Sequence, residues 1–458
     1  MKLSERLQAI DTGERAAPPE ANGRHEMPMP PVDPLTEFKT RTREDLFGKL
    51  EAKVLDASLS ESDLKAAVIE ELERLIAESA TPLSIAERER IAAEISEDIL
   101  GYGPVQKFLE DPAVTEVMVN CTDPIYVERS GKIERTTARF TSESHLRQVL
   151  ERIVASVGRR IDEASPMVDA RLPDGSRVNA IIPPLAVDGP AVTIRKFAAD
   201  PYRVEHLVEF GTLTPEVAAL LEVCVRGKLN LLISGGTGTG KTTLLNVLSS
   251  FVPANERIVT IEDAVELQLL QDHVVRLESR PSNVEGRGEV TVRDLVRNAL
   301  RMRPDRIIVG EVRGPEALDM MQAMNTGHEG SMSTLHANAP RDALSRLETM
   351  ILMAGLDIPV TAIREYISSA LSVIVHLSRM SDGSRRVTQV AEIVGMEGDV
   401  VTMQDVFRFE QAGIDEHGKV QGRMVATGIR PRFTEKLAAH GLLLPSTTFA
   451  PSPGGRAA

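Results

Sequence analysis

The segment with the clearest chemistry spans residues 235–242, Gly-Gly-Thr-Gly-Thr-Gly-Lys-Thr, and fits the pattern G-x-x-x-x-G-K-[ST]. Its glycines let successive backbone N–H groups turn inward and form a concave nest for anions. Lys241 brings a positive charge to the terminal phosphates of a nucleotide, and Thr242 offers a hydroxyl to Mg²⁺. The residues expected to hold the nucleotide are Gly235, Gly236, Thr237, Gly238, Thr239, Gly240, Lys241, Thr242 and Thr243.

An acidic residue follows an apolar run at residues 306–311, Arg-Ile-Ile-Val-Gly-Glu. This run predicts a buried strand, which we expect beside the strand that precedes the phosphate loop. Glu311 at its end can then reach the Mg²⁺ shell through a water, or approach the attacking water.

Residues 258–263, Ile-Val-Thr-Ile-Glu-Asp, repeat this layout with two acids. Successive strand residues point to opposite faces, so at most one of the two acids should face the phosphates directly. We assign Glu262 to polarising water, with Asp263 or Glu266 in a supporting role.

A third segment, residues 326–338, is rich in small polar residues and contains two histidines. An imidazole can contact the γ-phosphate and report its loss, although a lone loop histidine is more often a hydrogen-bonded surface residue. We assign the phosphate contact to His336 and a supporting role to His328. Metal binding by this pair is not expected, because no third or fourth ligand clusters with it.

The elements that must position these groups are visible around the phosphate loop. The apolar run 229–233, interrupted only by Asn230, predicts a buried parallel strand before the loop. A helix should begin at Lys241 and direct its positive N-terminal end at the phosphates. Strand and helix patterns alternate from Lys228 onward, as in a largely parallel sheet with a nucleotide at its edge.

Composition excludes several other classes. The net charge of −14 and pI near 5.3 disfavour a nucleic-acid-binding chain. The two cysteines, Cys121 and Cys224, are far apart and fit a reducing compartment. We expect no transmembrane segment and no secretory signal, and therefore a cytoplasmic protein.

The rest of the chain divides into segments of different pattern. Residues 1–42 are proline-rich without apolar periodicity and predict a disordered tail, and residues 446–458 predict a second, flexible tail. Helical periodicity over 43–100 predicts a small helical bundle. Short alternating strands predict an α+β domain over 101–203, and residues 204–445 predict the α/β domain that holds the nucleotide.

Four boxes in a fixed order make the pattern specific. They are the phosphate loop at 235–242, the acidic box at 260–263, the acidic strand at 307–313 and the histidine box at 327–338. Together they resemble the ATPases of type II and type IV secretion systems.

Two upstream stretches refine this resemblance. Residues 169–180 and 193–197 are similar to the branch that powers tight-adherence (Tad or Flp) pili, the CpaF/TadA group. The similarity covers about residues 98–377 well. The four-cysteine zinc module common in type II secretion members is absent from this chain, which has two cysteines.

The resemblance implies a RecA-like P-loop ATPase domain that uses ATP and Mg²⁺, with Thr242 and a water-bridged Glu311 holding the metal. It also implies a homohexamer, peripheral to the inner membrane, that hydrolyses ATP to move pilin through a polytopic platform protein during pilus assembly or retraction. Two alternatives stay open. One is a conjugative or type IV secretion ATPase that moves DNA or effector proteins, and the other is a nucleotide-gated scaffold with little turnover.

The resemblance gives the α+β domain a role as well. Arginines at matching positions approach the phosphates from across an interdomain cleft or from a neighbouring subunit, where they stabilise developing charge. Each such guanidinium could equally pair with a carboxylate. Because Arg171 and Arg177 flank one turn, we favour them as a pair. The candidates are Arg171, Arg177 and Arg195, with Arg159, Arg160 and Arg313 behind them.

Overall fold

The computed structural model describes two compact units. Almost all of the predicted tail at 1–42, and most of the predicted bundle at 43–100, lie outside the described residues. No helix in the described part of the chain combines the length and the apolar character needed to cross a bilayer. The described residues are 101–451 without 130, 158, 198–201 and 283–286, together with Glu61–Glu78 and single positions between 42 and 95.

In the first unit, helix α3 (Glu61–Glu78) is the longest described segment of the predicted bundle. Val68, Leu72 and Ile76 are buried along one face of this helix, as their spacing predicts. Ser84 and Glu87 form a capping box, in which Ser84 N donates to Glu87 Oε2 at 2.8 Å and Glu87 N donates to Ser84 Oγ at 3.3 Å.

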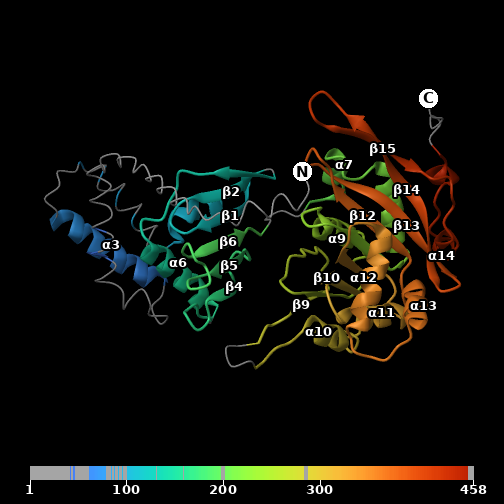
Figure 1. Cartoon of the computed structure of the whole chain (residues 1–458), viewed down its shortest axis with the longest axis horizontal. Helices are drawn as coiled ribbons and strands as arrows, with labels where there is room; N and C mark the ends of the chain where they lie inside the picture. Colours follow the sequence, from blue (N-terminus) through green and yellow to red (C-terminus); the bar gives the residue numbers. More distant parts are fainter. Residues whose placement is uncertain are drawn as a thin grey trace, which may run out of the picture. The chain divides into compact units, whose positions relative to one another are not determined.

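A six-stranded sheet in the order β3-β2-β1-β6-β5-β4 forms the centre of the first unit (Figure 1). The helix α6 (Glu143–Ser156) begins after Ser142, whose hydroxyl accepts a hydrogen bond from His145 N at 3.1 Å. The other elements are η1 (Gly103–Val105), α5 (Gln106–Glu110), β1 (Val114–Asn120), β2 (Ile125–Arg129), β3 (Lys132–Arg135), β4 (Met167–Arg171), β5 (Arg177–Ile181) and β6 (Ala191–Arg195).

The second unit contains a nine-stranded sheet in the order β15-β14-β13-β12-β7-β11-β10-β8-β9. In this order, the neighbours among β12, β7, β11, β10, β8 and β9 pair in parallel. The neighbours among β12, β13, β14 and β15 pair antiparallel. The strands are β7 (Leu231–Gly235), β8 (Ile258–Glu262), β9 (Val274–Glu278), β10 (Arg306–Val312), β11 (Met332–His336), β12 (Val373–Arg379), β13 (Arg385–Glu397), β14 (Val400–Ile414) and β15 (Val420–Ala426).

The expectation that the Glu311 strand adjoins the phosphate-loop strand is wrong. β11 lies between them, pairing Val309 of β10 with Ser333 and Ile233 of β7 with Thr334. Neighbouring strands are about 4.8 Å apart, so β10 and β7 are separated by about 10 Å. Sequence order cannot reveal this insertion, because β11 comes from a segment downstream of both strands.

Helices cover the two faces of this sheet (Figure 1). Leu231 and Ile233 of β7 belong to the core that holds α8 and α9, whereas Leu232 belongs to the core that holds α10 to α13. This alternation is the two-residue period of a strand buried on both faces. The helices are α7 (Val204–Glu209), α8 (Pro215–Arg226), α9 (Lys241–Ser249), α10 (Val292–Ala299), α11 (Glu316–Asn325), α12 (Pro340–Leu352), α13 (Val360–Ala370) and α14 (Phe433–Ala439).

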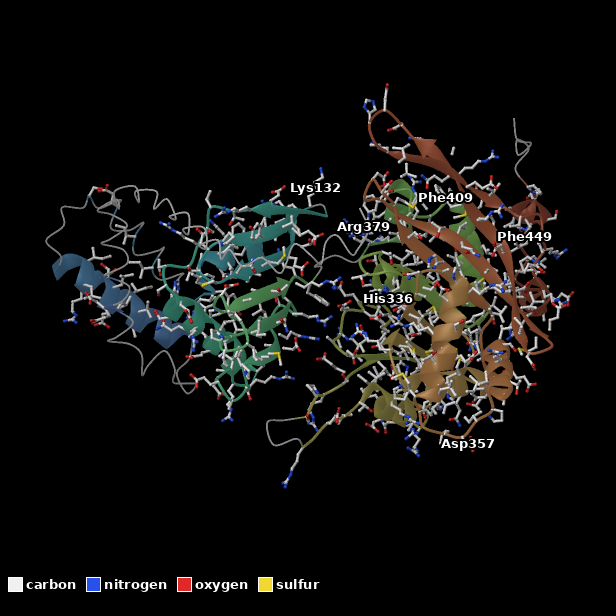
Figure 2. The ribbon with its side chains drawn as sticks, in the orientation of Figure 1. Lys132, His336, Asp357, Arg379, Phe409 and Phe449 are labelled. Atoms are coloured by element: carbon white, nitrogen blue, oxygen red, sulfur yellow. The ribbon has the colours of Figure 1, made fainter. Side chains whose placement is uncertain are left out.

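The predicted flexible tail from residue 446 is wrong for its first residues. A short 3₁₀ helix, η2 (Ser446–Phe449), is present, and Phe449, labelled in Figure 2, is only 5% exposed and joins the core beside α8 and α9. One apolar residue among Ser, Thr and Pro has no periodicity that the sequence could display. Residues 452–458 lie outside the described residues.

Candidate functional site

The phosphate loop connects β7 to α9 in the second unit. Gly238 and Gly240 have φ values of 69° and 92°, in the left-handed region that favours glycine. A Cβ on Gly235 would lie 2.6 Å from Leu377 O, so the tight packing against β12 also requires glycine there. The backbone geometry therefore accounts for three of the loop glycines.

Lys241 is the first residue of α9, and its Nζ donates a hydrogen bond of 2.8 Å to Gly236 O. Burial lowers the pKa of the Lys241 ammonium, while the Glu311 carboxylate opposes that shift. The lysine is thus folded back over its own loop and lies within electrostatic reach of the acid at the end of β10.

Glu262 ends β8 and is only 3% exposed. Its Oε2 accepts hydrogen bonds from Glu266 N at 2.8 Å and Leu267 N at 3.1 Å. Its Oε1 is buried and has no hydrogen-bond partner among the described residues. Burial raises the pKa of this carboxyl to about 7, even though the two backbone hydrogen bonds oppose the shift.

The Glu262 side chain also passes close to β10. A Cβ added to Gly310 would lie 2.9 Å from Glu262 Cγ, so the glycine makes room for the acid. Because Gly310 immediately precedes Glu311, the ends of β8 and β10 bring two acidic residues to one edge of the sheet. Asp263 turns away from the core and is exposed, as the alternation of side chains predicts.

Arg313 links the acids of the two strand ends. Its Nη2 lies 2.6 Å from Glu311 Oε2 and its Nη1 lies 3.3 Å from Asp263 Oδ2. The sequence left two roles open for Arg313, phosphate contact and carboxylate pairing. In this structure Arg313 pairs with carboxylates.

The two histidines of the third segment lie at opposite ends of β11. His336 ends the strand, pairs in register with Gly235 and is half-buried (Figure 2). His328 precedes the strand, so about 16 Å of extended chain separates it from the phosphate-loop edge. The supporting role expected of His328 is therefore contradicted, because a five-residue strand intervenes where the sequence suggested one loop.

Like Arg313, the candidates Arg177 and Arg195 group with the second unit by their contacts. Arg177 Nη1 lies 2.6 Å from Glu266 Oε1. Arg195 lines a small cavity that Thr242 and Thr243 of α9 also line.

The three remaining candidates, Arg159, Arg160 and Arg171, belong to the first unit. Arg171 ends β4, and Arg160 pairs with Asp162 at 3.3 Å. Arg159 Nη1 donates a hydrogen bond of 2.6 Å to Asp169 O.

The structure contains a buried serine–histidine contact beside the phosphate loop that the sequence did not predict. Ser234 Oγ lies 2.8 Å from His376 Nδ1, and both side chains are buried. Burial lowers the pKa of His376, against an opposing hydrogen bond to the Asn338 backbone, so the imidazole is neutral near pH 7. A lone histidine inside the apolar run 373–377 is the signal that could have identified it.

Arg385 is a second residue that the sequence did not single out. Its Nε donates a hydrogen bond of 2.9 Å to Gly238 O in the phosphate loop. It comes from β13, about 140 residues after the loop, and no motif distinguishes it from the neighbouring arginine.

The donor set at this edge fits Mg²⁺. The hydroxyl of Thr242 and the carboxylate of Glu311 are hard oxygen ligands, the kind that this ion prefers. Glu262 Oε1 is a buried oxygen without a partner among the described residues, and a water could satisfy it.

The fold and this site define a class of protein. A phosphate loop joins a parallel strand to a helix, and neighbouring parallel strands end in acids at the same edge, as in P-loop nucleotide-binding α/β domains.

Comparison with known proteins narrows the class. The family described as "Type II/IV secretion system protein" matches residues 98–430. This protein belongs to that family.

Several relatives share this similarity. A putative conjugal transfer protein of Mycobacterium tuberculosis (strain CDC 1551 / Oshkosh) is 40% identical over 309 residues, 66% of this chain and 87% of that protein. The type IV secretion system protein VirB11 of Brucella suis biovar 1 is 31% identical over 311 residues, 62% of this chain and 86% of that protein. The crystal structure of the Brucella suis VirB11 ATPase in complex with sulphate aligns with 63% of this chain and 91% of that chain, at 31% identity and a TM-score of 0.35.

Proposed function

We propose that this protein hydrolyses ATP, with Mg²⁺, as the motor of a type II/IV secretion machine. Family membership supports the class of machine. The observation that carries the proposal is Glu262, a buried carboxyl with a pKa near 7 and one partnerless oxygen, at the same sheet edge as the phosphate loop. A pKa near the working pH suits a group that takes a proton in each cycle.

The proposed reaction uses residues from three strands. Loop amides and Lys241 bind the phosphates, and Thr242 with a water-bridged Glu311 would hold Mg²⁺, which supplies charge neutralisation when bound. The water oxygen forms a bond to the γ-phosphorus, the bond from that phosphorus to the bridging oxygen breaks, and ADP leaves with the electron pair. The water proton passes to Glu262 Oε1, and His336 responds to the lost phosphate.

The motor would work as a homohexamer at the cytoplasmic face of the inner membrane. Arg171, Arg177 and Arg195 would close each site across domains or subunits, and hydrolysis would release that closure. Supporting residues would be Asp263, Glu266 and Arg313, which form the ion pairs around Glu311 and Arg177.

We propose pilin as the cargo, moved through a platform protein during assembly or retraction of a tight-adherence pilus. The basis is the similarity of residues 169–180 and 193–197 to that branch. The second candidate is a conjugative or type IV secretion ATPase, and the relative named for conjugal transfer, at 40% identity, favours it. Deleting the gene discriminates between them: the pilus proposal expects loss of surface pili with DNA transfer intact, and the reverse phenotype rejects it.

The enzymatic proposal is tested by phosphate release from MgATP. Wild-type protein should turn over ATP, and Lys241→Ala should lower turnover by about 100-fold or more, since it removes a charge that the transition state needs. Arg408→Ala, which removes an exposed arginine of β14 paired with Glu410, is the matched control for loss of one positive charge. ATP binding without phosphate release by the wild type would instead establish the scaffold alternative.

A further inference from the structure

The β12–β13 hairpin places a cation directly on the phosphate loop. Arg385 Nε donates its 2.9 Å hydrogen bond to Gly238 O, and Arg385 Cδ lies 3.6 Å from the position that a Cβ on Gly240 would take. The side chain therefore rests between the two left-handed glycines of the loop. Arg379, the register partner of Arg385 across the hairpin, is labelled in Figure 2.

The turn that carries Arg385 is held rigidly. Asp382 Oδ1 accepts hydrogen bonds from Ser384 N at 2.9 Å and Ser384 Oγ at 2.6 Å, and its Oδ2 accepts one from Val420 N at 2.9 Å. These bonds lower the pKa of Asp382 to about 2, so the carboxylate keeps them at any ordinary pH. Because this turn is already ordered, less conformational entropy is lost when Arg385 binds a ligand.

Among the side chains that the structure describes, no carboxylate balances the charge of Arg385 as carboxylates balance the charges of Arg313 and Arg177. Arg313 pairs with Glu311 and Asp263, and Arg177 pairs with Glu266. Among the residues that the structure describes, Arg385 has the Gly238 carbonyl as hydrogen-bond partner and no carboxylate within 4 Å.

Lys241 shows the same arrangement, with its Nζ on the Gly236 carbonyl. Both cations thus lie on neutral oxygens of one loop. A guanidinium or an ammonium binds an anionic phosphate oxygen more strongly than a neutral carbonyl oxygen, because both partners are then charged. Exchanging a carbonyl for a phosphate oxygen is therefore favourable for either side chain.

We propose that Arg385 is a second phosphate-binding cation of this site, supplied by the same chain that supplies the loop. When a nucleotide binds, the guanidinium exchanges Gly238 O for a phosphate oxygen, and the hairpin provides the fixed support from which it does so. This inference rests on the proposed nucleotide-binding function and extends it to a segment that lies outside the four sequence boxes.

The test measures binding of ATP, inorganic tripolyphosphate and adenosine to the full-length protein by calorimetry, with Mg²⁺ present. Arg385→Ala should weaken ATP and tripolyphosphate binding by about tenfold, because a hydrogen bond to a charged group is lost. Adenosine binding should not change. The matched control Arg408→Ala removes the same charge from an exposed position on β14 and should change neither affinity by more than about twofold.

A second variant separates charge from support of the loop. Gln at position 385 can still donate to Gly238 O but carries no charge, so Arg385→Gln should bind tripolyphosphate as weakly as Arg385→Ala. If Arg385→Gln binds tripolyphosphate with wild-type affinity, the proposal is overturned and Arg385 has only a structural role. Wild-type affinity in Arg385→Ala would also overturn it, with nucleotide binding intact. If the wild type binds neither ATP nor tripolyphosphate, the proposed function fails first, and this inference fails with it.

Discussion

At the scale of single residues, Glu262 differs from an ordinary surface acid in two ways. Its side chain is buried, and its Oε2 accepts two backbone hydrogen bonds whereas its Oε1 accepts none from the described residues. Burial dominates and raises the pKa of this carboxyl to about 7. A general base must be deprotonated to accept a proton. Turnover should therefore fall by about tenfold for each pH unit below about pH 7.

The measurement is a profile of kcat for ATP hydrolysis between pH 5.5 and 8.5. Glu262→Gln should lose this dependence along with most of its activity. A wild-type profile that is flat across pH 7 would contradict the role of Glu262 as the base.

The same pKa predicts how stability depends on pH. The folded-state pKa lies above the ordinary value of 4.5, so the folded protein holds a proton between pH 4.5 and 7 that the unfolded chain releases. This contribution to stability is fully present below pH 4.5 and is lost as the pH rises through 7. The free energy of unfolding of Glu262→Gln, measured relative to the wild type, should therefore rise by up to about 3 kcal/mol when the pH is raised from 5 to 8.

Urea unfolding of both proteins at the two pH values, without nucleotide, measures this difference. For the wild type, the free energy of unfolding at pH 5 is the reference for the loss of stability at pH 8. A gap between the two proteins that stays constant with pH would show that the carboxyl ionises normally.

At the scale of elements, a buried cluster fixes the end of the sheet opposite the phosphate loop. Arg306 at the start of β10 is fully buried, bonds Glu256 Oε2 at 2.5 Å and donates to Gly330 O at 3.2 Å. Asn230 accepts hydrogen bonds from Gly330 N and Ser331 N at 2.8 and 3.1 Å. This cluster ties β7, β10 and β11 together in the order that brings Glu311 and the phosphate loop to one edge of the sheet.

Gly330→Ala tests that cluster. The added methyl group would collide with the Arg306 guanidinium, and the backbone φ of +81° disfavours any side chain. We expect a loss of about 2–4 kcal/mol in the free energy of unfolding. Gly355→Ala is the matched control, because its φ is +74° but nothing lies within 4 Å, so the loss should be nearer 1 kcal/mol.

Urea denaturation of the two variants gives both values. Equal losses at the two positions would show that the cluster around Arg306 contributes no rigidity of its own.

The local elements of this site could be predicted from sequence, but their spatial order could not. The strand before the loop, the helix at Lys241 and the acids near the ends of β8 and β10 follow from apolar runs and glycine spacing. The insertion of β11 between β7 and β10 and the position of His328 depend on which strands pair, and this is a tertiary property. Arg385 and His376 come from strands far along the chain, where local pattern says nothing about the phosphate loop.

At the scale of the whole molecule, the proposed ring predicts that two inactive variants can restore each other. Lys241→Ala lacks a working phosphate loop but keeps Arg171, whereas Arg171→Ala keeps the loop and lacks the arginine. If the arginine acts on a neighbouring subunit, an equal mixture should recover about a quarter of wild-type sites, since each site needs one intact contributor from each side.

Phosphate release from the mixture, after subunits have exchanged, is the measurement. Each variant alone at the same total concentration is the control. Activity that never exceeds the sum of the two separate variants would place the arginine in the same subunit, or outside the site.

The central claim is that acids at the carboxyl ends of the parallel strands catalyse hydrolysis of a nucleotide held by the loop at 235–242. The most direct measurement compares Glu262→Gln with the wild type in two assays on one preparation, ATP affinity and single-turnover phosphate release. We predict affinity within about threefold of the wild type and release slower by about 100-fold or more, because the variant keeps the loop and loses the base. Phosphate release at the wild-type rate, with ATP bound normally, would contradict the account.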